Sequence, residues 1–177
     1  ELSLYQKKHE PFENFSIVYT GIFYNVPNVD CFIEGFERFL RAPHVNPEKV
    51  DFYMIGTELN PHEAMHKMHA LKNLSPNHIF ILPRGSAEEA ARYQQKAHVL
   101  ASFIPGSQAD GIMAAKTYYY AATKNPILIM PSKPGTDTPF FPGRDIQHFV
   151  FTGEEVYERL NFFYSAYLNG TPFKTSI

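Results

Sequence analysis

Residues 111–130, GIMAAKTYYYAATKNPILIM, join a loop of small residues, a helix and an apolar strand. The helix is expected to stop at Asn125 and Pro126, because a proline does not continue an α-helix. Such a helix points its free N–H groups, and the positive end of its dipole, at the loop that precedes it. Lys116 adds a full positive charge in the first turns. The stretch therefore predicts an α/β unit that carries a seat for a phosphate group.

The alternation of strand and helix extends along the whole chain. Besides residues 126–130, apolar or β-branched runs predict strands at residues 15–20, 50–55, 78–82, 97–103 and 148–151. Helices are expected over residues 31–41, 60–71, 86–95 and 153–167. Strands that are apolar on both faces are typical of parallel sheets covered by crossover helices. The sequence predicts an α/β fold with a doubly wound, mostly parallel sheet of about six strands.

Local signals define several helix starts. Asp30 is the expected cap of the helix at residues 31–41, and Asn60 with Pro61 is the expected start of the next one. Ser86 and Glu89 have the spacing of a capping box.

Composition limits the classes of function. A chain of 177 residues with 44% hydrophobic and 19% charged residues suits one globular domain. A net charge of −2 gives no basic field, so no nucleic-acid partner is predicted. The one cysteine, Cys31, excludes an intrachain disulfide and fits a reducing compartment, so a cytoplasmic location is expected. No apolar run approaches the ~18–20 residues that span a bilayer.

The chain starts at Glu1, and residues 1–14 show no strong periodicity. We expect them to be the tail of an upstream region or a linker, and residues 15–177 to form the domain. In a doubly wound sheet ligands bind beyond the carboxyl ends of the strands, which here are followed by the loops at 21–28, 83–86, 104–114 and 131–147. Neither G-x-G-x-x-G nor a P-loop lysine motif is present, which disfavours an ordinary NAD or ATPase site.

A formal H-E-x-x-H motif begins at His62 and ends at His66, with His69 on the same predicted helix face. In zinc peptidases this spacing places two metal ligands beside a general base. Here it lies outside the expected binding edge and no carboxylate third ligand is specified, so we interpret it as a solvated, histidine-rich face and predict no metal site.

Two aromatic runs remain. Tyr118, Tyr119 and Tyr120 are consecutive in a helix, about 100° apart, and therefore do not form one stacking platform. We expect at least one in the core and Tyr119 or Tyr120 near the cleft. Phe140 and Phe141 are expected to be exposed on a long loop unless a domain or ligand covers them.

With the elements placed, residues 15–168 resemble the C-terminal, donor-binding domain of GT-B glycosyltransferases of the family 4 type. FSIVYTGIFYNVPNVDCFIEGFERFL is similar to that family's first strand, glycine loop and helix, and VDFYMIG to its second unit. HIFILPRGSAEEAARYQQKAHVLASF resembles its base-contacting unit. GIMAAKTYYYAATKNPIL resembles the family pattern of a small helix start followed by K-x-x-E-Y-x-A-x-x-x-P-I-L.

The resemblance implies a diphosphate seat at the start of the last of these helices. There the N–H groups at Met113 and Ala114, together with Lys116, would meet the diphosphate, and the loop at Gly21 and Ile22 would approach it. A diphosphate is negatively charged, which suits a helix N-terminus and a lysine.

The nucleoside would lie near Arg84 and Tyr119. Arg84 falls where the family holds the base, and Tyr119 stands where the family has a ribose-binding glutamate. A phenol does not provide a carboxylate clamp for two hydroxyls. The family's E-x7-E pair is also absent, with Gly111 near its first position.

The sequence thus predicts the donor half of a transferase that moves a sugar from a nucleotide sugar to a glycan or a lipid-linked acceptor, without a cofactor. The acceptor domain and any general base would lie upstream, so the fragment alone is expected to be inactive. The full-length protein is expected to serve polysaccharide biosynthesis, and peripheral membrane association fits such acceptors.

One alternative is a decayed transferase-like domain that serves as an interaction module. A nucleotide-sugar epimerase ranks lower, since only His98, His148 and Asp110 are expected near the cleft as acid and base groups.

Overall fold

The computed structural model describes residues 2–23, 27–58, 62–104, 115–131 and 145–171. It confirms the doubly wound α/β fold: all neighbouring strands are parallel, in the order β3-β2-β1-β4-β5-β6. The strands are β1 (Phe15–Thr20), β2 (Val50–Ile55), β3 (Ile79–Leu82), β4 (Val99–Ile104), β5 (Ile127–Pro131) and β6 (Gln147–Phe149). The strand order reverses between β1 and β4, which makes that pair the topological switch point.

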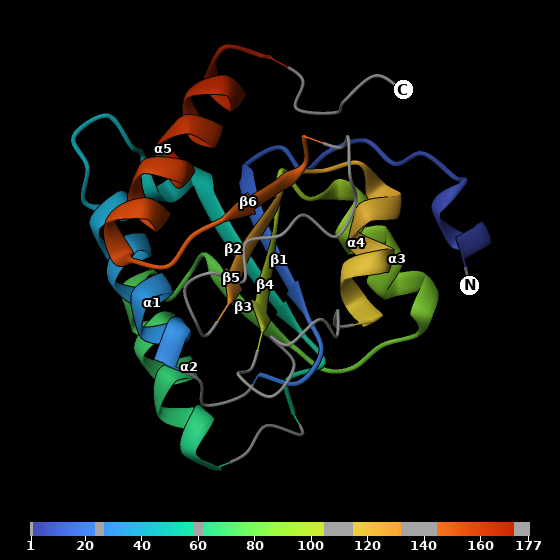
Figure 1. The fold of residues 1–177 in the computed structure, drawn as a ribbon, viewed down its shortest axis with the longest axis horizontal. Helices are drawn as coiled ribbons and strands as arrows, with labels where there is room; N and C mark the ends of the chain where they lie inside the picture. Colours follow the sequence, from blue (N-terminus) through green and yellow to red (C-terminus); the bar gives the residue numbers. More distant parts are fainter. Residues whose placement is uncertain (1, 24–26, 59–61, 105–114, 132–144, 172–177) are drawn as a thin grey trace.

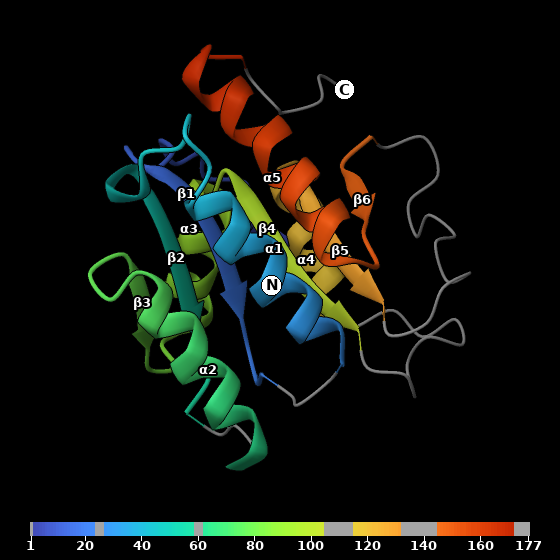
Figure 2. The same ribbon diagram turned by 90° about the vertical axis from the view of Figure 1, so that its left-hand side faces the viewer.

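Helices cover both faces of this sheet (Figures 1 and 2). One face carries α1 (Pro27–Leu40), α2 (His62–Leu74) and α5 (Gly153–Leu168). The other face carries α3 (Ala87–Lys96) and α4 (Ala115–Thr123). A short 3-10 helix, η1 (Leu2–Tyr5), lies beside α3 and α4, and a second one, η2 (Pro47–Lys49), leads into β2. The result is a three-layer molecule with two apolar interfaces.

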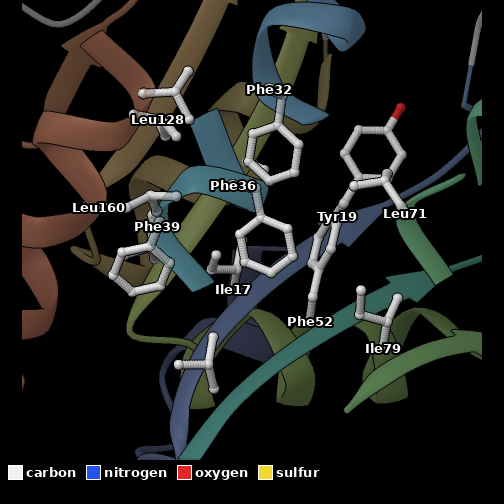
Figure 3. Packing of buried hydrophobic residues seen from close by; sticks show 14 of the residues in the cluster. Ile17, Tyr19, Phe32, Phe36, Phe39, Phe52, Leu71, Ile79, Leu128 and Leu160 are labelled. Atoms are coloured by element: carbon white, nitrogen blue, oxygen red, sulfur yellow. The ribbon is translucent and has the colours of Figure 1, made fainter. Parts of the chain in front are cut away.

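The two interfaces explain why the strands read as continuous apolar runs. In β1, Ile17 and Tyr19 belong to the cluster under α1, α2 and α5, whereas Val18 belongs to the cluster under α3 and α4. The larger cluster contains an aromatic row from α1, made of Phe32, Phe36 and Phe39, which packs on β1 and β2 (Figure 3). Burying a phenylalanine contributes about 1.5–3 kcal/mol, so this face supplies much of the stability.

The helix ends differ in detail from the predicted ones. The helix predicted from residue 31 begins at Pro27, and Asp30 lies in its first turn rather than capping it. The capping box of Ser86 and Glu89 is confirmed, and Thr152 with Glu155 forms a second one at the start of α5. The predicted helix start at Asn60 and Pro61 lies outside the described residues.

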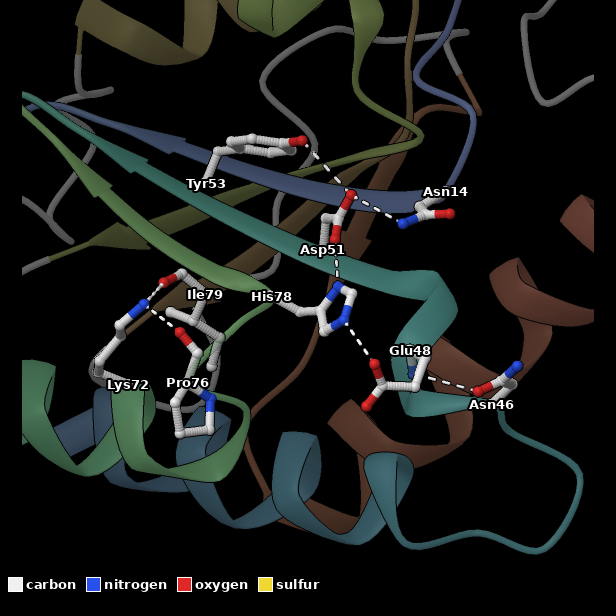
Figure 4. A network of polar contacts seen from close by, with 9 residues as sticks. All are labelled: Asn14, Asn46, Glu48, Asp51, Tyr53, Lys72, Pro76, His78 and Ile79. Carbon is white, nitrogen blue, oxygen red and sulfur yellow. Dashed lines mark hydrogen bonds and ion pairs between the residues drawn. The ribbon is translucent and has the colours of Figure 1, made fainter.

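A polar network closes the sheet where β2 and β3 begin (Figure 4). The carboxylate of Asp51, whose residue is 6% exposed, accepts from His78 Nδ1 at 2.9 Å and from Asn14 Nδ2 at 3.2 Å. His78 Nε2 lies 3.0 Å from the carboxylate of Glu48. Hydrogen bonding to Asp51, followed by that to Glu48, raises the pKa of His78. The protonated imidazole can donate to both carboxylates at once.

Candidate functional site

A pocket of about 410 Å³ lies at the carboxyl edge of the sheet, beside the switch point. Its walls come from the ends of β1 and β2, the loop after β3, one side of α3 and the start of α4. The lining residues are Thr20, Gly21, Ile22, Ile55, Gly56, Arg84, Gly85, Ser86, Ala87, Ala90, Gln94, Lys116 and Tyr119. This is the edge at which doubly wound sheets bind ligands.

Two glycines turn the chain away from the sheet and open the pocket floor. The N–H of Gly21 donates to Ile55 O at 2.8 Å, and the N–H of Gly56 donates to Leu82 O at 3.0 Å. The hydrogen bonding between β1 and β2, and between β2 and β3, therefore extends by one residue beyond the strand ends. Gly21 has φ +102° and Gly56 has φ +75°, values that L side chains rarely adopt. The backbone therefore lies bare at the positions where a ligand would approach it.

Lys116 reaches from the first turn of α4 to the end of β1. Its Nζ donates to the hydroxyl of Tyr19 at 2.9 Å and lies 4.2 Å from the centroid of the same ring. The Tyr19 hydroxyl in turn donates to Ile22 O at 2.5 Å. A Cβ at Gly21 would lie 3.5 Å from Lys116 Nζ, so the ammonium group and the glycine loop are in contact distance. Tyr19 thus ties the lysine to the loop.

Lys116 is held in partly desolvated surroundings. Burial lowers its pKa to about 8, because the charged form loses hydration there. In the described part of the chain no ion pair involves Lys116, since the salt bridges found there use other cations. An anion placed in the pocket would restore the lost stabilisation of the ammonium group.

The two strands at the switch point separate towards this edge. β1 and β4 are in register only at Ile17 with Val99 and at Val18 with Leu100. Further along, the N–H of Thr20 donates to the phenol oxygen of Tyr120 at 2.9 Å instead of to a strand. Burial raises the pKa of Tyr120 to about 12, which keeps this hydroxyl neutral. A side chain from α4 therefore fills the gap and satisfies the exposed backbone group.

Arg84 stands at the outer rim on the loop after β3. Its side chain is exposed, and its main-chain N–H donates to both carboxylate oxygens of Glu58, at 3.0 and 3.1 Å. Glu58 follows β2, so the loops after two strands are joined at the rim. The nearby start of α3 has Glu88 and Glu89 in its first turn, whereas the described first turn of α4 has no acidic residue. The positive end of the helix dipole is therefore less neutralised by acidic side chains in α4 than in α3.

The structure brings most of the predicted site residues together. Gly21, Ile22, Arg84, Lys116 and Tyr119 all line this one pocket. The predicted contacts at Met113 and Ala114, and the Phe140–Phe141 pair, lie outside the described residues.

Of the three tyrosines, Tyr120 is fully buried, Tyr119 lines the pocket and Tyr118 is 56% exposed, which confirms that they do not form one platform.

Thr20 and Gln94 are site residues that the sequence interpretation missed. Gln94 Nε2 donates to Thr20 Oγ1 at 3.0 Å, and both side chains line the pocket while being almost completely buried. Thr20 could have been found, because it is the last residue of the strand at the switch point. Gln94 lies inside a helix, and its sequence context carries no comparable signal.

The charged side chains that line the pocket are positive. Among the lining residues that the structure describes, the charged side chains are Arg84 and Lys116, both cations. No group of three or more His, Cys, Asp and Glu that could hold a metal occurs in the described ranges. The arrangement suits an anion with two or more charged oxygens, of which a diphosphate is the common biological example.

The groups expected for an epimerase do not meet at this pocket, which corrects their predicted placement. His98 precedes β4 and bonds to Ser16 Oγ at 2.9 Å, so it lies at the amino edge of the sheet. His148 lies in β6 against Phe163 of α5, and burial, with a smaller effect of Arg159, lowers its pKa to about 4. Neither histidine lines the pocket, and Asp110 is outside the described residues.

The H-E-x-x-H motif forms the start of α2. The rings of His62 and His66 are 6.1 Å apart between centroids, and both residues are exposed. The motif lies on α2, which covers the same face of the sheet as α1, and none of its residues lines the pocket.

Comparison with known proteins found no matching family model and no curated protein with a similar sequence. Solved structures do match. The C-terminal domain of a glycosyl transferase group 1 family protein (LpcC) from Francisella tularensis superposes with a TM-score of 0.66 at 14% identity, covering 98% of this chain and 87% of that one. The fold is that of a GT-B glycosyltransferase half.

Two larger proteins share this half. A putative UDP-N-acetylglucosamine 2-epimerase from Listeria monocytogenes has a TM-score of 0.62 at 12% identity, covering 97% of this chain. Anabaena Alr3699/HepE in complex with UDP and glucose has a TM-score of 0.62 at 12% identity, covering 98% of this chain. The present chain spans 44% and 47% of their lengths. In the described part of this chain, no helix has the length and apolar character needed to cross a membrane.

Proposed function

We propose that this domain is the donor-binding half of a glycosyltransferase and that its pocket holds the diphosphate of a nucleotide sugar. The observation that carries the proposal is the pairing of Lys116 and Arg84 in one pocket at the switch-point edge. The fold supports it, since the UDP and glucose complex named above belongs to a protein with the same half. The helix start at Met113 and Ala114 is proposed to add backbone donors to the same group.

In this function the pocket acts on the leaving group. As the bond between the anomeric carbon and the diphosphate oxygen breaks, the electron pair stays with the diphosphate and its negative charge grows. The ammonium group of Lys116, held by Tyr19 beside the glycine loop, would donate to that charge. Preorganised donors of this kind stabilise a transition state because they need no reorientation during the reaction.

The nucleoside is proposed to lie along the wall formed by Arg84 and Tyr119. With a tyrosine in place of a glutamate, the ribose would receive single hydrogen bonds rather than a bidentate carboxylate contact. Thr20 and Gln94 supply further polar atoms in this wall. No cofactor is required in this scheme.

The wider context follows the same proposal. We propose a family 4 type enzyme whose acceptor domain and general base lie upstream, so that this domain alone does not transfer sugar. We place this enzyme in the cytoplasm and assign it a role in polysaccharide biosynthesis. Peripheral membrane contact of the full-length protein would bring it to glycan or lipid-linked acceptors.

Calorimetric titration with UDP, GDP and ADP tests the proposal directly. At least one nucleotide should bind, and Lys116→Ala should weaken that binding about 10- to 100-fold, as for loss of a hydrogen bond to a charged group. Lys67→Ala is the matched control: it removes a cation from α2, where Lys67 pairs with Asp30 away from the pocket. Absence of heat with all three nucleotides would refute the proposal and favour the alternative of an interaction module.

A further inference from the structure

The residues that precede β1 lie against the outer wall of the pocket. The η1 helix lies beside α3 and α4 on the side away from α1 (Figure 1). Gln95 Nε2 of α3 donates to Leu4 O at 3.0 Å. Further along, Phe12 N donates to Lys96 O at 3.0 Å, and the Phe12 ring stacks on Tyr53 at 4.6 Å. The segment is thus attached to the domain near both of its ends.

Tyr5 is the residue of this segment that contacts the pocket wall. Its ring stacks on Tyr119 with a centroid distance of 6.1 Å and an interplanar angle of 17°. Its hydroxyl donates to Gln94 Oε1. Tyr119 and Gln94 both line the pocket, and they come from different helices, α4 and α3. One side chain therefore bridges the two helices behind the pocket.

The bridge continues into the sheet. Gln94 uses its other amide atom, Nε2, to donate to Thr20 Oγ1, and the N–H of Thr20 donates to Tyr120 of α4. Tyr5, Gln94, Thr20 and Tyr120 therefore form a chain of hydrogen bonds around the end of β1, and Tyr119, next to Tyr120 in α4, stacks on the Tyr5 ring. Without Tyr5, the carboxamide oxygen of Gln94 would lose this hydrogen bond and the Tyr119 ring would lose this stacking contact.

We propose that Tyr5 is a positioning residue of the nucleotide site: it fixes Tyr119 and Gln94 in the orientation in which they meet the nucleoside. The proposal rests on the proposed function of the pocket. Holding these side chains before binding reduces the conformational entropy lost on binding, which strengthens affinity. By linkage, a bound nucleotide stabilises the docked state of residues 2–5 by the same factor.

The experiment is calorimetry on wild type, Tyr5→Ala, Tyr5→Phe and Leu2→Ala, titrated with whichever of UDP, GDP and ADP binds wild type most tightly. Tyr5→Ala should weaken binding about 3- to 10-fold, as expected for loss of a stacked aromatic pair. Tyr5→Phe keeps the ring and should recover part of the loss. Leu2→Ala alters a 62% exposed residue of the same helix and should bind as wild type does.

Hydrogen exchange distinguishes positioning from a general loss of stability. Saturating nucleotide should slow amide exchange in residues 2–6 of wild type, and this protection should be smaller in Tyr5→Ala. If wild type binds a nucleotide and Tyr5→Ala binds it equally well, the inference is wrong while the proposed function stands. If wild type binds none of the three nucleotides, the proposed function fails and the inference fails with it.

Discussion

The two edges of the sheet treat buried charge in opposite ways. At the amino edge, the buried carboxylate of Asp51 is surrounded by His78, Asn14 and Tyr53. At the carboxyl edge, the partly buried ammonium group of Lys116 has a neutral phenol as its hydrogen-bond partner. The pKa values show the difference, since hydrogen bonding raises that of His78 whereas burial lowers that of Lys116. The charged groups at the amino edge already have their partners, whereas a bound anion would stabilise the ammonium group at the carboxyl edge.

The comparison separates residues that support the fold from residues that await a ligand. A buried charge with its partners in place contributes to stability only as a set, because removal of one member leaves the others desolvated. A buried charge without a counterion costs stability in the free protein and returns it when a ligand of opposite charge binds. Substitutions at the two edges should therefore affect different measurements.

The largest expected effect is on stability at the amino edge. Asp51→Ala removes the acceptor of His78 and Asn14 and should lower the free energy of unfolding by about 3 kcal/mol. Urea denaturation measures this loss, and nucleotide affinity of the folded variant should stay within about twofold of wild type. The mirror variant Lys116→Met should keep or raise stability while losing affinity. Equal stability of Asp51→Ala and wild type would show that the network is dispensable.

The next effect is the pH dependence of ligand binding at the carboxyl edge. Because the pKa of Lys116 in the free protein is lowered to about 8 and a bound diphosphate would raise it, binding takes up a proton above pH 8. Affinity should be highest below pH 8 and should fall by at most about tenfold per pH unit above it. Titration at pH 7.5, 8.5 and 9.5 in two buffers with different ionisation enthalpies measures both affinity and proton uptake.

Lys116→Met is the control for that profile. The variant lacks the titrating group, so its weaker affinity should be flat over the same range. A falling profile in Lys116→Met would assign the proton to another group near the pocket. A flat profile in wild type would mean that Lys116 does not pair with the ligand.

The sequence was sufficient for the fold because the deciding signals are local and repeated. The central strands β1, β4 and β5 are buried on both faces, and the helices between the strands have start signals or apolar stripes, so the alternation predicts a covered parallel sheet. The ends were less predictable: Asp30 has the chemistry of a cap, yet the helix begins at Pro27 because further apolar residues, Val29 among them, are buried there. Tertiary packing extended the helix beyond its strongest local signal.

The site was predictable only where a motif marks it. Two of the predicted residues, Gly21 and Arg84, follow strand ends, and Lys116 lies at the start of a helix. Such positions lie at the same edge in any doubly wound sheet. Gln94 and Tyr5 belong to the same wall through contacts 74 and 89 residues apart in sequence. His98 was misplaced near the cleft, because it directly precedes β4 and so lies at the amino end of that strand, whereas the pocket follows the carboxyl ends.

The smallest expected effect is the pH dependence of stability at the amino edge. Hydrogen bonds to Asp51 and Glu48 raise the folded-state pKa of His78 above the usual value of 6.5. The resulting stabilisation is fully present below the unfolded pKa and is lost as the pH rises through the folded one. His78→Gln should therefore destabilise the domain more at pH 5.5 than at pH 8.5, by about 0.5–1 kcal/mol, because the exposed Glu48 partner is screened by solvent. Urea unfolding of wild type and His78→Gln at the two pH values measures the difference. His44→Gln is the matched control, since it removes a histidine that contacts the neutral side chain of Asn161 and lies outside the Asp51 network. A larger loss at pH 8.5 than at pH 5.5 would mean that neutral His78 is the stabilising form, and the contrast between the two edges would then rest on Asp51 alone.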